Sequence, residues 1–222
     1  MQTIEAIVFD FDGVIVDTEP LYEIAEKRLF ADYGIIVPDK DWKIFKGSSE
    51  ADFYHLIKER YNITASEAEL RRKGRQFLLE AFSGGIDYLP GYAEFVKKID
   101  GTVKTGLVTA TSGKVLAWIF QATSIRNSFK YIVTAEDVKR SKPHPEPYHK
   151  MFDMLNVVPS KTIVIEDSIN GIRSAKAAGA ITIGLCSSFS ARDLDLADYA
   201  AKDYSEIENI VFSILKKGIN RK

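Results

Sequence analysis

The stretch Phe9-Asp10-Phe11-Asp12-Gly13-Val14 determines how this chain folds. This stretch stands at the end of the run from Ile4 to Phe9, which is mostly apolar and β-branched and has Glu5 as its only charge. That pattern predicts a strand buried on both faces, as in a parallel sheet. Asp10 and Asp12 stand two residues apart, so on an extended backbone their side chains point to the same side. Open α/β sheets bind ligands at the carboxyl ends of their strands, which is where this pair of acids lies.

Three further polar signals follow along the chain, each after its own apolar run: Thr109, Lys142 and the pair Glu166-Asp167. From residue 92 onward, apolar strand patterns alternate with helical ones, which predicts an α/β fold with a doubly wound parallel sheet. The carboxyl ends of parallel strands lie at one edge of the sheet. One cleft can therefore collect Asp10, Thr109 and the acidic pair, and Lys142 can reach it from a loop.

Residues from about 17 to 84 carry helical spacing of apolar positions and no strand pattern. A helical insert directly after the first strand predicts a separate and smaller domain. We therefore expect residues 1–16 and 89–222 to form a Rossmann-like core and residues 17–88 an all-helical cap domain. Gly84, Gly85 and Gly91 supply backbone freedom where the chain returns to the core.

Composition limits the possible partners. The 222 residues include 30 basic and 31 acidic side chains, for a net charge of -1. Without a basic excess, we expect no nucleic acid or anionic membrane as partner and a small-molecule ligand instead. No obligate protein partner is evident from the sequence. Cys186 is the only cysteine, which suits the reducing cytoplasm. No signal-peptide pattern and no apolar run of the ~18 residues needed to span a membrane is visible, so we expect a cytoplasmic protein.

Taken together, the polar segments resemble the haloacid dehalogenase superfamily of phosphotransferases, and within it the branch of β-phosphoglucomutases and sugar-phosphate phosphatases with a helical cap. Each segment alone is a common structural feature, whereas four in this order are specific, and the resemblance covers nearly the whole chain. The residues that carry it are Asp10-Phe11-Asp12-Gly13-Val14, Leu107-Val108-Thr109-Ala110-Thr111-Ser112, Ser141-Lys142-Pro143-His144-Pro145, and Ile165-Glu166-Asp167-Ser168 with Gly171.

The resemblance implies a role for each residue near the reacting phosphate. Asp10 is the nucleophile that forms an aspartyl-phosphate, and Asp12 is the general acid and then the general base. Asp12 must begin protonated for the first of these roles, so we predict that its pKa is raised. Thr109 donates its hydroxyl and Ala110 its backbone N–H to the phosphate. Lys142 adds a positive charge on Asp10 or on a phosphate oxygen.

A cation is also expected, because clustered acids repel a phosphate monoester that carries about two negative charges. Carboxylate, carbonyl and phosphate oxygens are the ligands that Mg²⁺ prefers. By resemblance, Mg²⁺ is held by the Asp10 carboxylate, the main-chain carbonyl of Asp12, and Asp167. Glu166 is a further ligand, either directly or through a water molecule.

We therefore expect a Mg²⁺-dependent phosphatase that acts on a small phosphorylated metabolite such as a sugar or polyol phosphate. The alternative is a hexose-phosphate mutase, which needs a cationic group on the cap for a second phosphate. In the resembling mutases an Arg shortly after a Lys-Gly pair supplies that group. Here Lys46-Gly47 is present, but Glu50 stands near the matching place, and Tyr22 stands where the mutases carry a His. Tyr22, Lys46 and Glu50 are thus candidate substrate contacts.

Two other hypotheses fit the residues less well. A haloacid dehalogenase needs no metal, which would leave Asp12 and Asp167 without a role. A non-enzymatic receiver module also combines an acidic pocket, a phosphorylated Asp, a hydroxyl and a Lys on a doubly wound sheet. In such a module the acceptor Asp usually lies on a strand in the middle of the chain, whereas Asp10 follows the first strand and precedes a helical insert.

Overall fold

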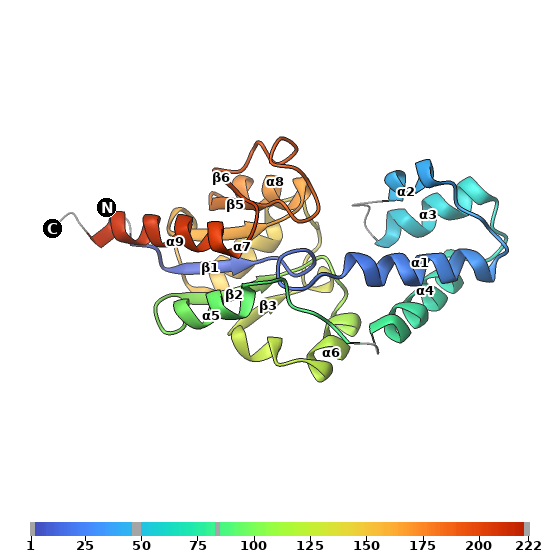
Figure 1. The fold of residues 1–222 in the computed structure, drawn as a ribbon, viewed down its shortest axis with the longest axis horizontal. Helices are drawn as coiled ribbons and strands as arrows, with labels where there is room; N and C mark the ends of the chain where they lie inside the picture. Colours follow the sequence, from blue (N-terminus) through green and yellow to red (C-terminus); the bar gives the residue numbers. More distant parts are fainter. Residues whose placement is uncertain (1–2, 46–49, 83–84, 220–222) are drawn as a thin grey trace. The chain divides into compact units, whose positions relative to one another are not determined.

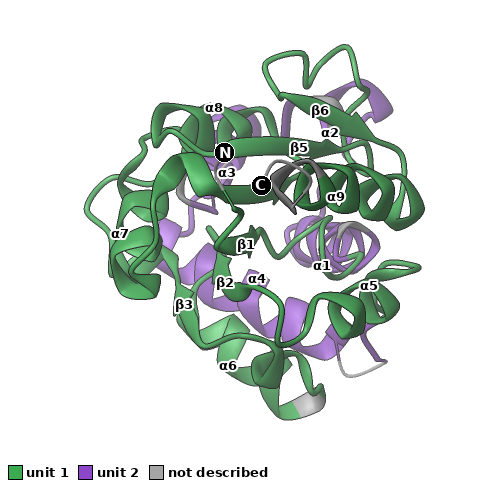
Figure 2. Ribbon diagram, turned by 90° about the vertical axis from the view of Figure 1, so that its left-hand side faces the viewer, with its two compact units in different colours: residues 1–17, 87–222 green, residues 18–86 purple. Residues whose placement is uncertain are grey.

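The structure, a computed structural model, describes residues 3–45, 50–82 and 85–219 of the chain. Two compact units make up the chain, Met1–Asp17 with Asp87–Lys222 and Thr18–Ile86 (Figure 2). The division expected from the sequence differs from these units by one residue at the first boundary and two at the second. That the smaller unit acts as a cap stays a prediction.

The larger unit is built on a six-stranded parallel sheet with the strand order β3-β2-β1-β4-β5-β6 (Figure 1). β1 lies between β2 and β4, so that Phe9 is level with Leu107 on one side and Ile165 on the other. The doubly wound parallel sheet predicted from the sequence is confirmed. The strands are β1 (Ala6–Phe9), β2 (Lys104–Val108), β3 (Tyr131–Val133), β4 (Thr162–Glu166), β5 (Ile181–Leu185) and β6 (Tyr199–Ala201).

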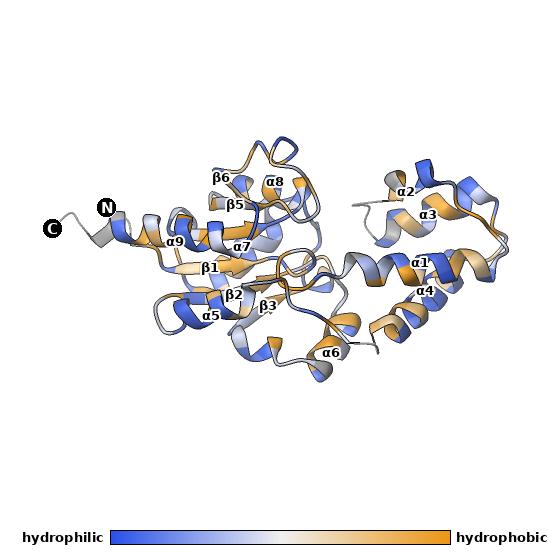
Figure 3. Cartoon of the chain, in the orientation of Figure 1, coloured by the Kyte–Doolittle hydropathy of each residue, from blue (hydrophilic) through white to orange (hydrophobic). Residues whose placement is uncertain are grey.

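Helices cover both faces of this sheet (Figure 2), and β1 is hydrophobic along its length (Figure 3). Successive side chains of a strand point to opposite faces, so an apolar strand needs cover on both sides. Val8 belongs to the core cluster beneath α7 and α8. Phe9 points the other way, where its ring meets Phe95 of α5 and Phe129, and Phe95 in turn meets Tyr204 of α9. The helices are α5 (Tyr92–Ile99), α6 (Gly113–Ala122), α7 (Glu146–Leu155), α8 (Ile169–Ala177) and α9 (Tyr204–Ile219), with short 3-10 turns at Ile125–Ser128, Ala135–Asp137 and Pro159–Lys161.

The sequence pattern did not predict β6. This strand is three residues long, two of its side chains are exposed, and it pairs only with β5 at the edge of the sheet. A short edge strand needs neither an apolar run nor alternation, so the signal that identifies buried strands is missing there.

The described residues of the smaller unit form four helices, α1 (Glu19–Asp32), α2 (Asp39–Phe45), α3 (Glu50–Tyr61) and α4 (Glu67–Phe82). Their apolar sides meet around Phe30, whose ring contacts Trp42, Phe45 and Phe53. The helical interpretation of this region is confirmed. None of the helices in the described ranges of the chain is long and apolar enough to cross a membrane.

Candidate active site

The carboxyl ends of three neighbouring strands carry most of the predicted site residues. Asp10 directly follows β1, Thr109 follows β2, and Glu166 ends β4 with Asp167 next to it. The backbone N–H of Asp10 donates to the carbonyl of Ile165 at 3.0 Å, which extends the pairing of β1 with β4 to the first acid of the motif. Because β1 is buried along its whole length, the position of Asp10 is set by the core.

Lys142 reaches this edge from the loop that precedes α7. Its Nζ donates to Asp10 Oδ1 at 2.5 Å, to Glu166 Oε1 at 2.6 Å and to the carbonyl of Val108 at 3.0 Å. All three ammonium protons therefore have acceptors, and the side chain is only 8% exposed. The sequence left open whether Lys142 contacts Asp10 or a phosphate. In the structure it contacts Asp10 and also binds Glu166.

Glu166 is fully buried, yet both of its carboxylate oxygens are hydrogen-bonded. Oε1 accepts from Lys142 and from the hydroxyl of Tyr148 at 3.0 Å. Oε2 accepts from the backbone N–H groups of Asp167 and Ser168, each at 3.0 Å, and from the hydroxyl of Ser168 at 2.9 Å. Five donors explain how a carboxylate is tolerated in this position, because a buried charge must be paired and hydrogen-bonded.

The acids form a cluster with too little positive charge to balance it. Asp10, Glu166 and Asp167 have carboxylate oxygens that lie within 4.8 Å of one another. With all three ionised, the ammonium of Lys142 leaves a net charge of -2 among these four side chains. Oxygen ligands with this residual charge fit a divalent cation such as Mg²⁺.

The pKa values of these groups reflect the same imbalance. Burial raises the pKa of Asp10 well above its ordinary value, and the charge of Glu166 adds to this, while Lys142 partly offsets it. Burial also raises the pKa of Asp167 to about 7, again with a contribution from Glu166. Burial alone would lower the pKa of Lys142, but the carboxylates of Asp10 and Glu166 raise it well above its ordinary value, so Lys142 stays charged.

Gly13 makes room for Asp167. Its backbone lies in the left-handed region, with φ at +70°, and a Cβ added there would collide with the Asp167 carboxylate. The carbonyl of Gly13 accepts a hydrogen bond from the Ser187 hydroxyl at 2.6 Å. Gly171 plays the same part for Glu166, because a Cβ at Gly171 would overlap that carboxylate.

Asp12, Thr109 and Ala110 lie at the same edge of the sheet. Asp12 Oδ2 accepts a hydrogen bond from the hydroxyl of Thr111 at 2.5 Å, and Thr109 Oγ1 accepts one from the backbone N–H of Thr111 at 2.9 Å. Ala110, between the two threonines, is exposed. Sequence reasoning assigned no role to Thr111, although it stands two residues after Thr109 in the same motif. The expectation that the pKa of Asp12 is raised stays a prediction.

The candidate substrate contacts outside the core lie in the smaller unit or beyond the described residues. Tyr22 is in α1, and Glu50 is the first residue of α3. Arg75 of α4 donates two hydrogen bonds to Glu50, each of 2.7 Å, so Glu50 is ion-paired and not an isolated negative charge. Lys46 lies outside the described residues.

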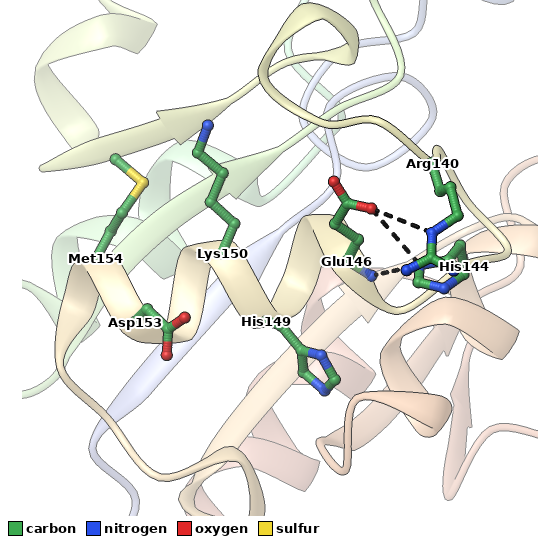
Figure 4. Close-up of a pocket in the computed structure, with 7 residues that line it drawn as sticks. All are labelled: Arg140, His144, Glu146, His149, Lys150, Asp153 and Met154. Carbon is green, nitrogen blue, oxygen red and sulfur yellow. Dashed lines mark hydrogen bonds and ion pairs between the residues drawn. The ribbon is translucent and has the colours of Figure 1, made fainter.

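A surface hollow of about 420 Å³ lies along α7 and the loop before it (Figure 4). Arg140 and His144 border it, and Glu146 links them, since its carboxylate accepts from Arg140 at 3.4 Å and its backbone N–H donates to His144 Nδ1 at 3.1 Å. Among the described residues, none of the predicted site residues lines this hollow.

Comparison with known proteins identifies the family. Residues 7–185 match the family described as haloacid dehalogenase-like hydrolase. The chain is a haloacid dehalogenase-like hydrolase. The family resemblance seen in the sequence is thus confirmed, and the protein is an enzyme.

Two curated relatives of this hydrolase are phosphatases by name. A phosphorylated carbohydrates phosphatase of Thermotoga maritima is 31% identical over 176 residues, which are 79% of this chain and 82% of that protein. Hexitol phosphatase B of Escherichia coli is 29% identical over 179 residues, 78% of this chain and 79% of that protein.

Solved structures of similar fold include two with β-phosphoglucomutase in their names. A putative β-phosphoglucomutase of Thermotoga maritima has a TM-score of 0.81 and 29% identity, and the match covers 95% of this hydrolase and all of that chain (100%). The β-phosphoglucomutase of Clostridium difficile has a TM-score of 0.82 and 25% identity, with 99% and 100% covered.

The fit of Gly13 against Asp167 predicts how two glycine substitutions differ. Gly13 and Gly101 have nearly the same φ, +70° and +69°, but a Cβ added at Gly101 meets nothing within 4 Å. We expect Gly101→Ala to lower the free energy of unfolding by about 1–2 kcal/mol, the strain of a left-handed alanine. Gly13→Ala adds a collision in a packed site, so we expect a further loss of about 1–3 kcal/mol. Urea unfolding measures both, and equal losses would contradict the steric role of Gly13.

The raised pKa of Asp167 predicts how stability depends on pH. The pKa of Asp167 is about 7 in the folded protein and 3.8 ordinarily. At a pH between these two values, the unfolded chain has lost a proton that the folded protein still holds. The free energy of unfolding of the metal-free protein should therefore fall as the pH rises from about 4 to about 7, and Asp10 contributes with the same sign. Urea unfolding in EDTA at several pH values, with Asp167→Asn as the control, measures this. We expect a weaker fall in the variant, and parallel curves would contradict the assignment.

Proposed function

We propose that this hydrolase is a Mg²⁺-dependent phosphatase that hydrolyses a sugar or polyol phosphate through an aspartyl-phosphate on Asp10. The observation that carries the proposal is the buried contact of Lys142 with both Asp10 and Glu166, beside Asp167, at the carboxyl edge of the sheet. The substrate class is supported by the names of the relatives that act on phosphorylated carbohydrates and hexitols.

Asp10 is the nucleophile in this proposal. Lys142 holds Oδ1 at 2.5 Å, so we assign Oδ2 to attack phosphorus. A nucleophilic carboxylate must be ionised, and burial opposes this, since it raises the pKa of Asp10. The permanent charge of Lys142 is therefore needed next to the nucleophile, and it also balances charge that develops on the phosphoryl oxygens.

Asp10, the main-chain carbonyl of Asp12, and Asp167 would hold the Mg²⁺ ion. When bound, the ion balances the charge of the carboxylates and of the phosphate oxygens. We assign Glu166 to positioning and not to direct ligation, because its two oxygens already accept hydrogen bonds from five donors. Glu166 thereby holds Lys142 against Asp10.

The remaining residues bind the phosphate and move a proton. Thr109 Oγ1 accepts from the backbone of Thr111, so its own proton can point toward a phosphate oxygen. Ala110, an exposed residue, would add its backbone N–H as a donor next to it. Asp12 protonates the leaving alcohol and then takes a proton from the attacking water.

A hexose-phosphate mutase is the second candidate, because two of the similar solved structures are β-phosphoglucomutases by name. A mutase must hold a second phosphate with a cation. Arg75 is a cation in the smaller unit, but it is engaged by Glu50 through two hydrogen bonds. This pairing favours the phosphatase, and the lysine at position 46 lies outside the described residues.

Phosphate release tests the proposal. With Mg²⁺, we expect the protein to release inorganic phosphate from sorbitol 6-phosphate or another member of a sugar and polyol phosphate panel, and to stop when EDTA is added. Asp10→Asn should lower kcat by at least about 10³-fold, because it removes the nucleophile. Asp153→Asn is the control, since Asp153 is an exposed acid of α7 that lines the surface hollow.

Two results would contradict this function. The first is phosphate release by Asp10→Asn at the wild-type rate. The second is a mutase reaction. With β-glucose 1-phosphate and a trace of glucose 1,6-bisphosphate, glucose 6-phosphate would then accumulate faster than inorganic phosphate.

A further inference from the structure

Thr111 makes two hydrogen bonds that join two parts of the site. Its backbone N–H donates to Thr109 Oγ1 at 2.9 Å, and its hydroxyl donates to Asp12 Oδ2 at 2.5 Å. Asp12 follows β1 and Thr111 follows β2, and 99 residues of sequence separate them. Thr111 is 8% exposed, so water competes little for either bond. A buried hydroxyl thus connects the residue assigned to bind phosphate with the residue assigned to move the proton.

We propose that Thr111 is a positioning residue for Asp12, which fixes the carboxyl oxygen that exchanges a proton with the substrate. The inference rests on the proposed phosphatase function and adds to it a residue that the family resemblance does not assign. Thr111 acts through Asp12 and has no assigned contact with the reacting atoms.

The hydrogen bond from Thr111 distinguishes the two oxygens of the Asp12 carboxyl group. A carboxyl group has two similar oxygens, and a proton on either one is chemically equivalent in water. The Thr111 hydroxyl donates to Oδ2, so Oδ2 must act as an acceptor. We assign the proton of a protonated Asp12 to Oδ1, so that Oδ2 keeps the hydrogen bond from Thr111. After Asp12 gives up this proton, the carboxylate still accepts from Thr111, so the same hydrogen bond serves both states.

Asp12 gives up one proton in the first step and regains one in the second. In the first step, Asp10 Oδ2 forms a bond to phosphorus, the bond from phosphorus to the leaving oxygen breaks, and the proton of Asp12 Oδ1 passes to that oxygen to give the alcohol. In the second step, water attacks phosphorus, its proton passes to Asp12, and the bond from phosphorus to Asp10 breaks. Both steps need Oδ1 at hydrogen-bond distance from the reacting oxygen, so a carboxyl that can rotate loses rate in both.

A purely structural role for Thr111 would have different consequences. If Thr111 only joined the ends of β1 and β2, removing its hydroxyl would slow all substrates equally. A positioning role in proton donation affects substrates unequally. Phenol is a poor leaving group that needs the proton as its bond to phosphorus breaks, whereas p-nitrophenol leaves well as the anion. Phenyl phosphate and p-nitrophenyl phosphate have nearly the same shape. A difference between the two substrates in how much kcat/KM falls in a variant therefore reports proton donation and not binding.

The experiment compares kcat/KM for phenyl phosphate and p-nitrophenyl phosphate, with Mg²⁺, in the full-length wild type and three variants. The parameter kcat/KM reports the step in which the leaving group departs. Thr111→Val removes the hydroxyl and keeps the shape, and Thr111→Ser keeps the hydroxyl. Thr105→Val is the matched control, because Thr105 lies at the opposite end of β2 and donates a similar bond of 2.7 Å to the carbonyl of Ser128.

We expect Thr111→Val to lower kcat/KM by about 10- to 100-fold for phenyl phosphate and by less than about threefold for p-nitrophenyl phosphate. Thr111→Ser and Thr105→Val should stay within about threefold of wild type for both. Equal losses for the two substrates in Thr111→Val, or no recovery in Thr111→Ser, would overturn the positioning role. A wild type that releases phosphate with Mg²⁺ from neither these esters nor the sugar and polyol phosphate panel would instead overturn the proposed phosphatase function, so the wild type alone distinguishes the two failures.

Discussion

One buried ammonium group, that of Lys142, is shared by the carboxylates of Asp10 and Glu166, and the rest of the site is arranged around this contact. Three acids lie within reach of one another at the edge of the sheet, and Lys142 offsets only one of their charges. In a buried position the excess charge cannot be relieved by water, so burial raises the pKa values of Asp10 and Asp167. A chain that keeps such a cluster gains from binding a divalent cation.

The fold supplies this contact through several elements that have no direct part in the chemistry. Glu166 stays in place because Tyr148 and the first residues beyond β4 donate to it, and the ammonium of Lys142 lies 5.3 Å from the centre of the Tyr148 ring. Glycines leave space where two of the carboxylates need it, at Gly13 and Gly171. Positions of this kind combine a steric and an electrostatic requirement, so their substitution should affect stability and activity together.

Much of this architecture could be predicted from the sequence, because the parallel sheet imposes it. Once strands alternate with helices, residues that end strands share one edge, and this is enough to place Asp10, Thr109 and the acidic pair near one another. Side-chain contacts between residues of different elements do not follow from such a rule. Three such contacts became visible only in the structure, because they depend on tertiary packing. Lys142 binds two acids, Arg75 pairs with Glu50, and Thr111 donates to Asp12. The edge strand β6 was missed because it carries no buried pattern.

If Asp10, held by Lys142, takes the phosphoryl group, the aspartyl-phosphate can be trapped during turnover. The protein is mixed with Mg²⁺ and excess p-nitrophenyl phosphate, quenched in acid within the first turnovers, and reduced with borohydride, which converts an acyl phosphate to the alcohol. Mass spectrometry of the digested protein should then find homoserine at position 10, and none when Mg²⁺ is omitted. Rapid phosphate release with no modified residue, or with the modification at another acid, would contradict the account.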